Sequence, residues 1–257
     1  MISYFRDGRL YEAESFLSAV KLDSADCPVI AAVGAGGKTS TLRRLAEEYA
    51  SSGRKAIVLT TTHMREETTP WSCVAEEEEW LREGTVLLDQ VKKCLEQYGQ
   101  VWIGTRAKKG KMSSVPETIL KEIEKWKIPL LVEADGARML PLKVPGEQEP
   151  VILPQTTHVF SVYGMDALDQ KLEEICFRSE KAAELLGKMP EDKVTEEDLV
   201  KLACHEQGGR KGCLKQAEYV VVLNKADTKE LQERACKIAK CLHENGIKNI
   251  FVTSYML

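Results

Sequence analysis

Residues 29–42 read VIAAVGAGGKTSTL, and this stretch decides how the rest of the chain is interpreted. An apolar run typical of a buried strand is followed by a glycine-rich turn, a lysine and a hydroxyl residue, and then by a helical pattern. This order matches the phosphate-binding loop G-x-x-x-x-G-K-[ST], in which free N–H groups at a helix N-terminus face an anion. Ala32 replaces the first glycine of that pattern, and we expect it at the strand end, where a small side chain is tolerated.

The loop predicts a site for a nucleoside triphosphate and Mg²⁺. Its glycines allow the backbone to approach phosphates and to adopt positive φ angles. Lys38 is expected to pair with the β and γ phosphates, and the Thr39 hydroxyl is expected to bind Mg²⁺. The predicted nucleotide-binding residues of the loop are Gly34, Ala35, Gly36, Gly37, Lys38, Thr39 and Ser40.

Apolar, β-branched segments alternate with helical segments along the chain. Several apolar segments are continuous runs, as in strands that are covered on both faces. Helical segments end at Gly53 and Gly246, which are typical helix stops. This order predicts an α/β fold, a P-loop NTPase-like three-layer arrangement with a mostly parallel central sheet. The expected strands are PVIAAV (28–33), KAIVLTTT (55–62), QVWIGT (100–105), IPLLVEA (128–134), THVFSVYG (157–164), EYVVVLN (218–224) and NIFVTS (249–254).

We expect one nucleotide-binding domain over residues 1–257, with a less regular insertion or subdomain around 137–217. The acidic run 76–79 is expected on the solvated face of a helix. Two basic stretches, RAKKGKMSS (106–114) and QGGRKG (207–212), are interpreted as mobile loops, either plain surface loops or a lid that contacts a partner.

The overall composition narrows the class of protein. Hydrophobic residues make up 43% and charged residues 30% of the chain, as in a globular protein. The net charge of −4 gives no support for nucleic acid or an anionic membrane as partner. No apolar run approaches the roughly 20 residues of a membrane span. The polar N-terminus lacks the pattern of a secretory signal, so we expect a cytoplasmic protein.

Eight cysteines are scattered along the chain, and none forms a C-x-x-C pair. The default for such residues in a reducing compartment is a free thiol. The tightest group is Cys204 and His205 with Cys213. Its spacing is not that of a typical zinc site.

The sequence NKAD (224–227) follows the apolar run YVVVL. N-K-x-D at a strand end is the guanine-recognition element of GTPases. The Asp227 carboxylate would accept both N1–H and the exocyclic amino group of guanine. Asn224 would steady the loop and reach the base, and the stem of Lys225 would cover one face of the ring. The alternative is an ordinary helix start with Asp227 as its cap.

Three further strand ends carry polar residues that fit the same site. The strand LLVEADGA ends in Glu133 and Asp135, an arrangement that holds Mg²⁺ in nucleotide-hydrolysing enzymes. Asp135 is the preferred metal ligand, and both carboxylates are candidate catalytic residues, with a plain surface pair as the alternative. His63, in TTTHM (60–64), is either a catalytic residue or a structural one. A final turn with Thr253 and Ser254 would support the base or simply end a strand.

Taken together, VGAGGKTS, TTTHM, VEADGARMLPLKVPGEQEPVI, VYGMDALDQ, FRSE and VVLNKAD resemble the YqeC family of selenium-dependent molybdenum hydroxylase accessory proteins, also described as selenium cofactor biosynthesis proteins. The resemblance extends from about Val29 to Asp227. It implies a P-loop nucleotide-binding protein, with Lys143 and Glu149 near the phosphates or a substrate. Ser179 stands where the family more commonly has proline, which weakens the assignment of Arg178 as a phosphate contact.

The expected function is therefore a Mg²⁺-dependent protein that binds and hydrolyses a nucleotide, GTP in preference to ATP, during maturation of a selenium-dependent molybdenum hydroxylase or its cofactor. The candidate catalytic residues are Lys38, Glu133, Asp135 and His63. Two alternatives stay open: an ATP-dependent small-molecule kinase or ligase, and a non-hydrolysing, nucleotide-gated carrier that uses Cys204 and Cys213.

Overall fold

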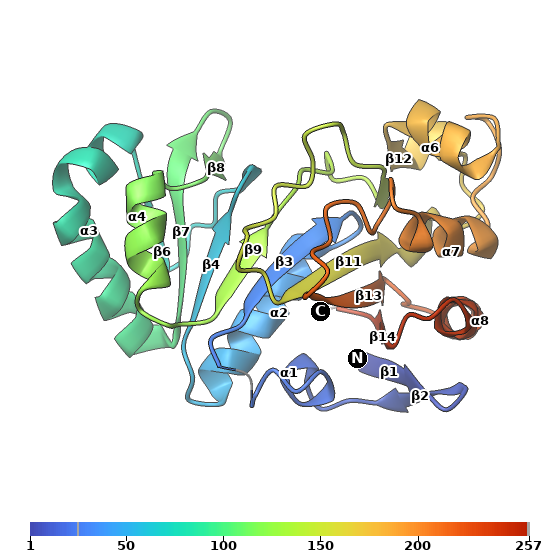
Figure 1. Cartoon of the computed structure of the whole chain (residues 1–257), viewed down its shortest axis with the longest axis horizontal. Coiled ribbons are helices and arrows are strands. Elements are labelled where there is room, and N and C mark those ends of the chain that lie inside the picture. Colours follow the sequence, from blue (N-terminus) through green and yellow to red (C-terminus); the bar gives the residue numbers. More distant parts are fainter. Residues whose placement is uncertain (25, 256–257) are drawn as a thin grey trace.

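The computed structural model describes residues 1–24 and 26–255, and its centre is a mostly parallel sheet with helices on both sides (Figure 1). Among these residues, twelve strands form the sheet in the order β2-β1-β14-β13-β11-β3-β9-β4-β7-β8-β5, with β6 also paired to β7. The seven strands from β14 to β7 in this order run parallel, and antiparallel pairs lie at both edges.

The seven strands from β14 to β7 are the seven that the apolar runs predict, so the α/β fold with a mostly parallel sheet is confirmed. An eighth parallel strand, β6, pairs with β7 and was not predicted. The strands are β1 (Ile2–Arg6), β2 (Arg9–Glu12), β3 (Val29–Gly34), β4 (Ala56–Thr60), β5 (His63–Arg65), β6 (Ser72–Ala75), β7 (Gln100–Ala107), β8 (Lys111–Ser113), β9 (Leu130–Glu133), β10 (Leu142–Lys143), β11 (His158–Gly164), β12 (Cys176–Phe177), β13 (Glu218–Asn224) and β14 (Asn249–Thr253).

The helices cover the sheet in two layers. Figure 1 shows α2 behind the sheet, α3 and α4 at one end of the opposite face, and α6 to α8 at the other end. The helices are α1 (Phe16–Ala19), α2 (Lys38–Ser51), α3 (Glu77–Tyr98), α4 (Glu117–Glu124), α5 (Leu172–Ile175), α6 (Ser179–Leu186), α7 (Glu196–Cys204) and α8 (Lys229–Glu244), with a short 3-10 helix at Met165–Ala167.

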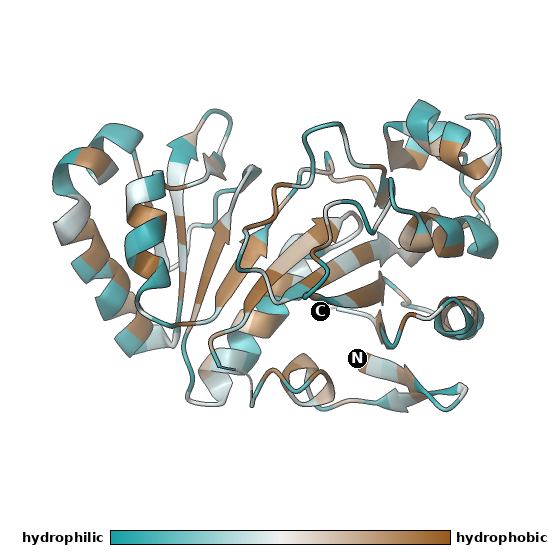
Figure 2. Ribbon diagram, viewed as in Figure 1, coloured by the Kyte–Doolittle hydropathy of each residue, from teal (hydrophilic) through white to brown (hydrophobic). Residues whose placement is uncertain are grey.

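Side-chain alternation along the strands builds a core on each face of the sheet. Ile57 and Leu59 of β4 pack toward α3 and α4, whereas Val58 packs toward α2. This is the two-residue period of a strand, so a continuous apolar run fills both cores. Figure 2 accordingly shows hydrophobic residues concentrated on the central strands and hydrophilic residues on the outer surfaces of the helices.

The region 137–217 consists of two stretches on either side of β11, which is itself a central strand of the sheet. The first stretch has a single short strand, β10. The second contains the short helices α5, α6 and α7. β10 pairs in parallel with β12, so a small two-stranded sheet joins the two stretches.

One of the two basic stretches that were expected to be loops forms a β-hairpin instead. Residues 106–114 lie largely in the hairpin of β7 and β8, where Arg106 pairs with Met112, so the interpretation of the whole stretch as a loop is wrong. Met112 is buried under the sheet edge, which gives this hairpin an apolar anchor. The other stretch, 207–212, is a series of turns, and Lys211 donates hydrogen bonds from it to the backbone at Gly146 and Glu147. Across the described residues, no helix has both the length and the apolar character needed to cross a membrane.

Candidate functional site

The site lies where the chain changes direction across the sheet. From β3 the chain runs to β4 on one side, returns to β9 beside β3, and then continues to β11 on the other side of β3. In open parallel sheets, ligands bind beyond the carboxyl ends of the strands at such a switch point. The residues that follow β3, β9 and β13 meet at this edge.

The N-terminus of α2 faces this edge without a cap. Gly37 is the N-cap residue, it offers no side-chain hydrogen bond, and the first turn contains no acidic residue. The backbone N–H groups of residues 37–40 donate no hydrogen bond within the described part of the chain. Unpaired N–H groups and the positive end of a helix dipole together favour an anion at this position.

Lys38 is the first residue of α2 and is buried. Its ammonium donates to the carbonyl of Gly34 at 2.8 Å and lies 3.0 Å from Oδ1 of Asp135. Burial alone would lower the pKa of Lys38, but the charges of Asp135 and Glu133 outweigh it and raise that pKa. The lysine therefore stays charged beside the helix N-terminus.

The glycine loop between β3 and α2 is shorter than the sequence pattern suggests. Ala32 does not lie at the strand end, because β3 continues to Gly34 in register with Val162 of β11. The expectation for Ala32 is therefore wrong: it is a buried strand residue paired with Phe160 and Glu133. Only residues 35–37 connect the strand to the helix.

Two glycines allow this loop to pack against its neighbours. Gly36 has a φ of 79°, and a Cβ atom there would lie 2.2 Å from the backbone nitrogen of Gly164. Gly37 has a φ of 130°, and a Cβ atom there would lie 2.1 Å from the side-chain nitrogen of Asn224. Both positions require glycine for backbone conformation and for space. The N–H of Ala35 already donates to Val162, so phosphate contacts would fall to residues 37–40.

Two acidic residues at the end of β9 face the loop from the other side. Glu133 accepts a hydrogen bond from the Thr39 hydroxyl at 2.6 Å. Asp135 accepts from the N–H of Gly34 at 3.1 Å. Burial raises the pKa of Glu133, although Lys38 and Thr39 act in the opposite direction. The structure thus pairs Thr39 with Glu133, whereas Asp135 contacts Lys38.

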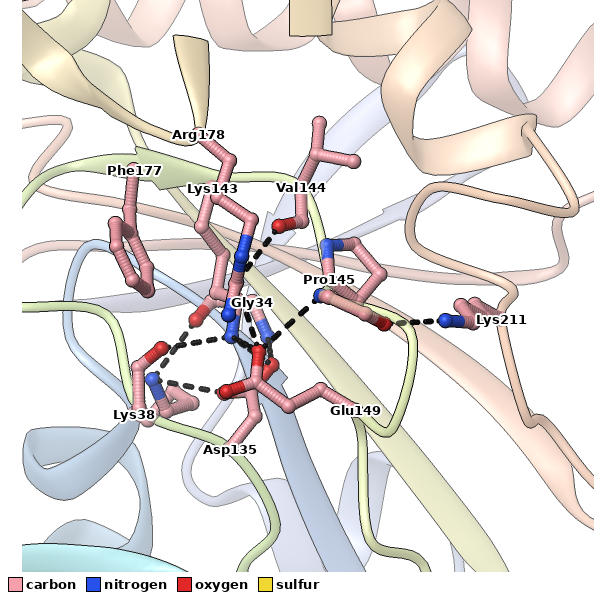
Figure 3. A network of polar contacts seen from close by, with 12 residues as sticks. Gly34, Lys38, Asp135, Lys143, Val144, Pro145, Glu149, Phe177, Arg178 and Lys211 are labelled. Atoms are coloured by element: carbon pink, nitrogen blue, oxygen red, sulfur yellow. Dashed lines mark hydrogen bonds and ion pairs between the residues drawn. The ribbon is translucent and has the colours of Figure 1, made fainter. Parts of the chain in front are cut away.

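Asp135 is also held by a second buried lysine (Figure 3). The Lys143 ammonium lies 3.0 Å from Oδ2 of Asp135 and 2.8 Å from Oε2 of Glu149, and its side chain has no exposed surface. Arg178 donates to the same oxygen of Glu149 at 2.9 Å. Burial would raise the pKa of Glu149, but its hydrogen bonds with Arg178 and Lys143 lower it to about 2. Lys143, Glu149 and Arg178 thus form one ionic network with Asp135.

The NKAD segment touches the glycine loop directly. The Asn224 side chain is buried, donates to the carbonyl of Gly36 at 2.8 Å and accepts from the Thr253 hydroxyl at 2.8 Å. Ser254 donates to Oδ1 of Asp227 at 2.5 Å. β13, β14 and the glycine loop are therefore fastened together through one amide side chain.

Lys225 has a φ of 63° and pairs with Asp166 at 2.6 Å. Asp166 follows β11, so this ion pair links the end of β11 to the NKAD segment. Asp166 was not predicted as a site residue, although it lies in the stretch VYGMDALDQ that carries the family resemblance. Phe177 was likewise missed. The sequence indicates Phe177 only weakly as a site residue, because only the pairing of β10 with β12 brings its ring beside Lys143.

Other predicted residues lie apart from this network. His63 is exposed in β5 at the edge of the sheet, where it lies opposite Ser113, and its side chain makes no hydrogen bond or ion pair with the described residues. Ser40 is exposed on the first turn of α2. His158 is buried at the start of β11, as a structural residue, and burial lowers its pKa.

Cys204 and Cys213, the two cysteines considered for a carrier site, lie in different surroundings. Cys204 lines a groove of about 740 Å³ between α7 and α8, together with His205 and Cys241. Cys213 packs instead against the apolar group around Val33 and Val159. Burial raises the pKa of both thiols, which disfavours the reactive thiolate. The described residues contain no cluster of three or more His, Cys, Asp or Glu side chains suited to a metal ion.

The molecule is thus an α/β protein with a mostly parallel sheet and a buried, charged site at its switch point. A family model described as YqeC protein matches residues 30–180. The chain is also 31% identical over 227 residues to the "Uncharacterized protein YqeC" of Escherichia coli (strain K12), an alignment that covers 87% of this chain and 86% of that protein. The chain belongs to the YqeC family, and the resemblance read from its motifs is confirmed.

Proposed function

We propose that this protein binds and hydrolyses GTP with Mg²⁺, as a P-loop nucleotide-binding protein. The single observation that carries the proposal is the contact between Asn224 and Gly36, because it joins a guanine-recognition sequence to a helix N-terminus fit for phosphates. The biological setting implied by the family resemblance, maturation of a selenium-dependent molybdenum hydroxylase or its cofactor, belongs to the same proposal.

The phosphates would bind at the N-terminus of α2. Four backbone N–H groups that donate to none of the described residues and one charged lysine meet there, and the nearest glycines leave no side chain in the way. These are the elements that hold β and γ phosphates in P-loop proteins. Lys38 would exchange its contact with Asp135 for phosphate oxygens, since both are anions.

Mg²⁺ would enter with the nucleotide. Mg²⁺ keeps several waters and usually takes one or two protein oxygens together with substrate phosphates, so it needs no closed protein cage. The Thr39 hydroxyl and the Glu133 carboxylate, 2.6 Å apart, fit that role. Asp135, the metal ligand expected from the sequence, has both carboxylate oxygens next to lysines, so it would act beyond the first coordination shell. Held by these residues and by the nucleotide, Mg²⁺ would neutralise part of the phosphate charge.

The base would bind beside Asp227. Its Oδ1 is oriented by Ser254, and a carboxylate keeps further acceptor positions for N1–H and the amino group of guanine. Adenine offers no such donor pair. Lys225, turned by its positive φ and fixed by Asp166, would lie along the ring.

Hydrolysis would proceed by positioning and charge neutralisation rather than by covalent chemistry with the protein. Among the predicted candidates for orienting the attacking water, Glu133 fits best. It accepts a hydrogen bond from the Thr39 hydroxyl at 2.6 Å, so it lies at the N-terminus of α2, where the phosphates would bind. Asp135 is neutralised by two lysines, and His63 lies at the sheet edge.

A variant that changes the preference from guanine to xanthine tests the proposed base site. Asp227→Asn should weaken GTP binding and strengthen binding of xanthosine triphosphate, because the new amide can donate to the xanthine carbonyl at C2. Isothermal titration calorimetry with both nucleotides measures the exchange. Asp89→Asn is the matched control and should leave both affinities unchanged, since Asp89 is an exposed carboxylate of α3 whose ion pair with Lys92 lies away from the proposed base site.

Unchanged GTP affinity in Asp227→Asn would refute the assignment of the base. A wild-type protein that prefers ATP to GTP would instead favour the ATP-dependent kinase or ligase. Nucleotide binding without turnover would favour the nucleotide-gated carrier.

A further inference from the structure

A group of cationic side chains surrounds the segment that follows Asp135. Most of them are occupied by protein acceptors. Arg178 donates to Val144 and Glu149, Lys181 to Pro145, and Lys211 to Gly146 and Glu147. These cations hold the 144–149 segment in place, and each of them already contacts at least one protein acceptor.

Arg138 is the exception. It lies three residues after Asp135, is exposed, and has no hydrogen-bond acceptor or ion-pair partner within residues 1–24 and 26–255. Its guanidinium only stacks on the ring of Phe177, with Cζ 4.6 Å from the ring centroid. Arg178 stacks on the same ring at 4.2 Å, so a second cation competes for this aromatic partner.

The segment that carries Arg138 lies over the glycine loop. It is anchored on one side by Asp135, which accepts from Gly34, and on the other by Leu140, which accepts from the N–H of Gly36 at 3.3 Å. Arg138 and Met139 both have positive φ angles, 49° and 63°. Non-glycine residues in this left-handed region of φ carry backbone strain, and strained residues of this kind cluster at active sites and ligand-binding segments.

We propose that Arg138 is a catalytic residue of the phosphoryl transfer, an arginine supplied within the chain that contacts the γ phosphate of bound GTP. This inference rests on the proposed function. A fork of five N–H donors matches phosphate oxygens in a bidentate manner, and Arg138 is the cation of this group that has no competing acceptor among the described residues.

The step is the transfer of the γ-phosphoryl group to water. The oxygen of water forms a bond to the γ phosphorus as the bond from that phosphorus to the β–γ bridging oxygen breaks, giving GDP, inorganic phosphate and one proton. Negative charge grows on the bridging oxygen as it leaves with GDP. A guanidinium at the γ phosphate stabilises this charge, while Lys38 holds the ground-state phosphates.

The test compares Arg138→Ala with Arg138→Lys and with Arg9→Ala. Arg9 is a matched control, an exposed arginine of the N-terminal hairpin that has no acceptor among the described residues. Single-turnover hydrolysis of GTP and binding of a non-hydrolysable GTP analogue are measured for each. Arg138→Ala should lower the hydrolysis rate at least ~100-fold, with analogue affinity changed by no more than ~2-fold. Arg138→Lys should recover part of the rate, because it keeps the charge and loses the fork.

A second readout is the complex of GDP with aluminium fluoride, followed by ¹⁹F NMR, because that complex resembles the transition state. Wild type and Arg9→Ala should form it, and Arg138→Ala should not. Hydrolysis by Arg138→Ala within ~3-fold of wild type would overturn the inference and leave GTP binding intact. Wild type that binds GTP but hydrolyses none alone would also overturn it, because an internal arginine needs no partner. Absence of GTP binding by wild type would refute the proposed function itself.

Discussion

Replacing Asp135 by asparagine should destabilise the folded protein strongly. Asp135 is the shared counter-charge of two buried ammonium groups, at 3.0 Å from Lys38 and 3.0 Å from Lys143. The side chains of Lys38 and Lys143 are 5% and 0% exposed, so water cannot solvate their ammonium groups once the carboxylate is removed. Lys143 would keep Glu149 as a partner, whereas Lys38 would keep only the carbonyl of Gly34. Removing one partner of a buried ion pair costs about 3–5 kcal/mol, and we expect a loss of that size.

Urea unfolding followed by circular dichroism measures this loss as a lower transition midpoint at unchanged slope. The control is Asp166→Asn, which breaks a half-exposed ion pair with Lys225 and should cost about 0–1 kcal/mol. Addition of inorganic triphosphate should stabilise Asp135→Asn more than the control, because the anion supplies the missing charge. A loss below about 1 kcal/mol in Asp135→Asn would refute the view that this carboxylate neutralises both lysines.

Two further predictions concern charges of the same network. The pKa of Glu149 is lowered in the folded protein to about 2, from its usual 4.5. Its contribution to stability is therefore complete above pH 4.5 and is lost as the pH falls toward 2. Acid unfolding of Glu149→Gln should lack this dependence, and identical acid transitions of the variant and the wild type would contradict the prediction. Lys38→Ala should weaken GTP binding at least ~100-fold in calorimetry, because it removes the buried cation at the helix N-terminus, and unchanged affinity would exclude the phosphate-loop interpretation.

The central strands were predictable because the feature that makes each of them a buried strand lies within its own few residues. A parallel strand covered on both faces is a continuous apolar run, and all seven such runs form parallel strands of the sheet. The antiparallel hairpin of β1 and β2 was missed, although the sequence Asp7-Gly8 at its turn is a recognised hairpin signal. Both residues have positive φ angles there, as a tight hairpin turn requires.

The candidate site was predictable only where its residues follow strands directly. Lys38, Asp135 and Asn224 meet because parallel strands end at the same edge of the sheet. Arg138 and Phe177 approach each other through the pairing of β10 with β12, which two-residue strands do not reveal in sequence. The length of the glycine loop could not be predicted from the sequence either, because the apolar pattern stops before β3 ends at Gly34.

The most direct measurement of the central claim is a calorimetric titration of the wild-type chain with GTP and, separately, with ATP, each in the presence of Mg²⁺. The account predicts saturable binding of GTP and much weaker binding of ATP, because Asp227 can pair with the donors of guanine and not with adenine. Equal affinity for both nucleotides, or binding of neither, would contradict it.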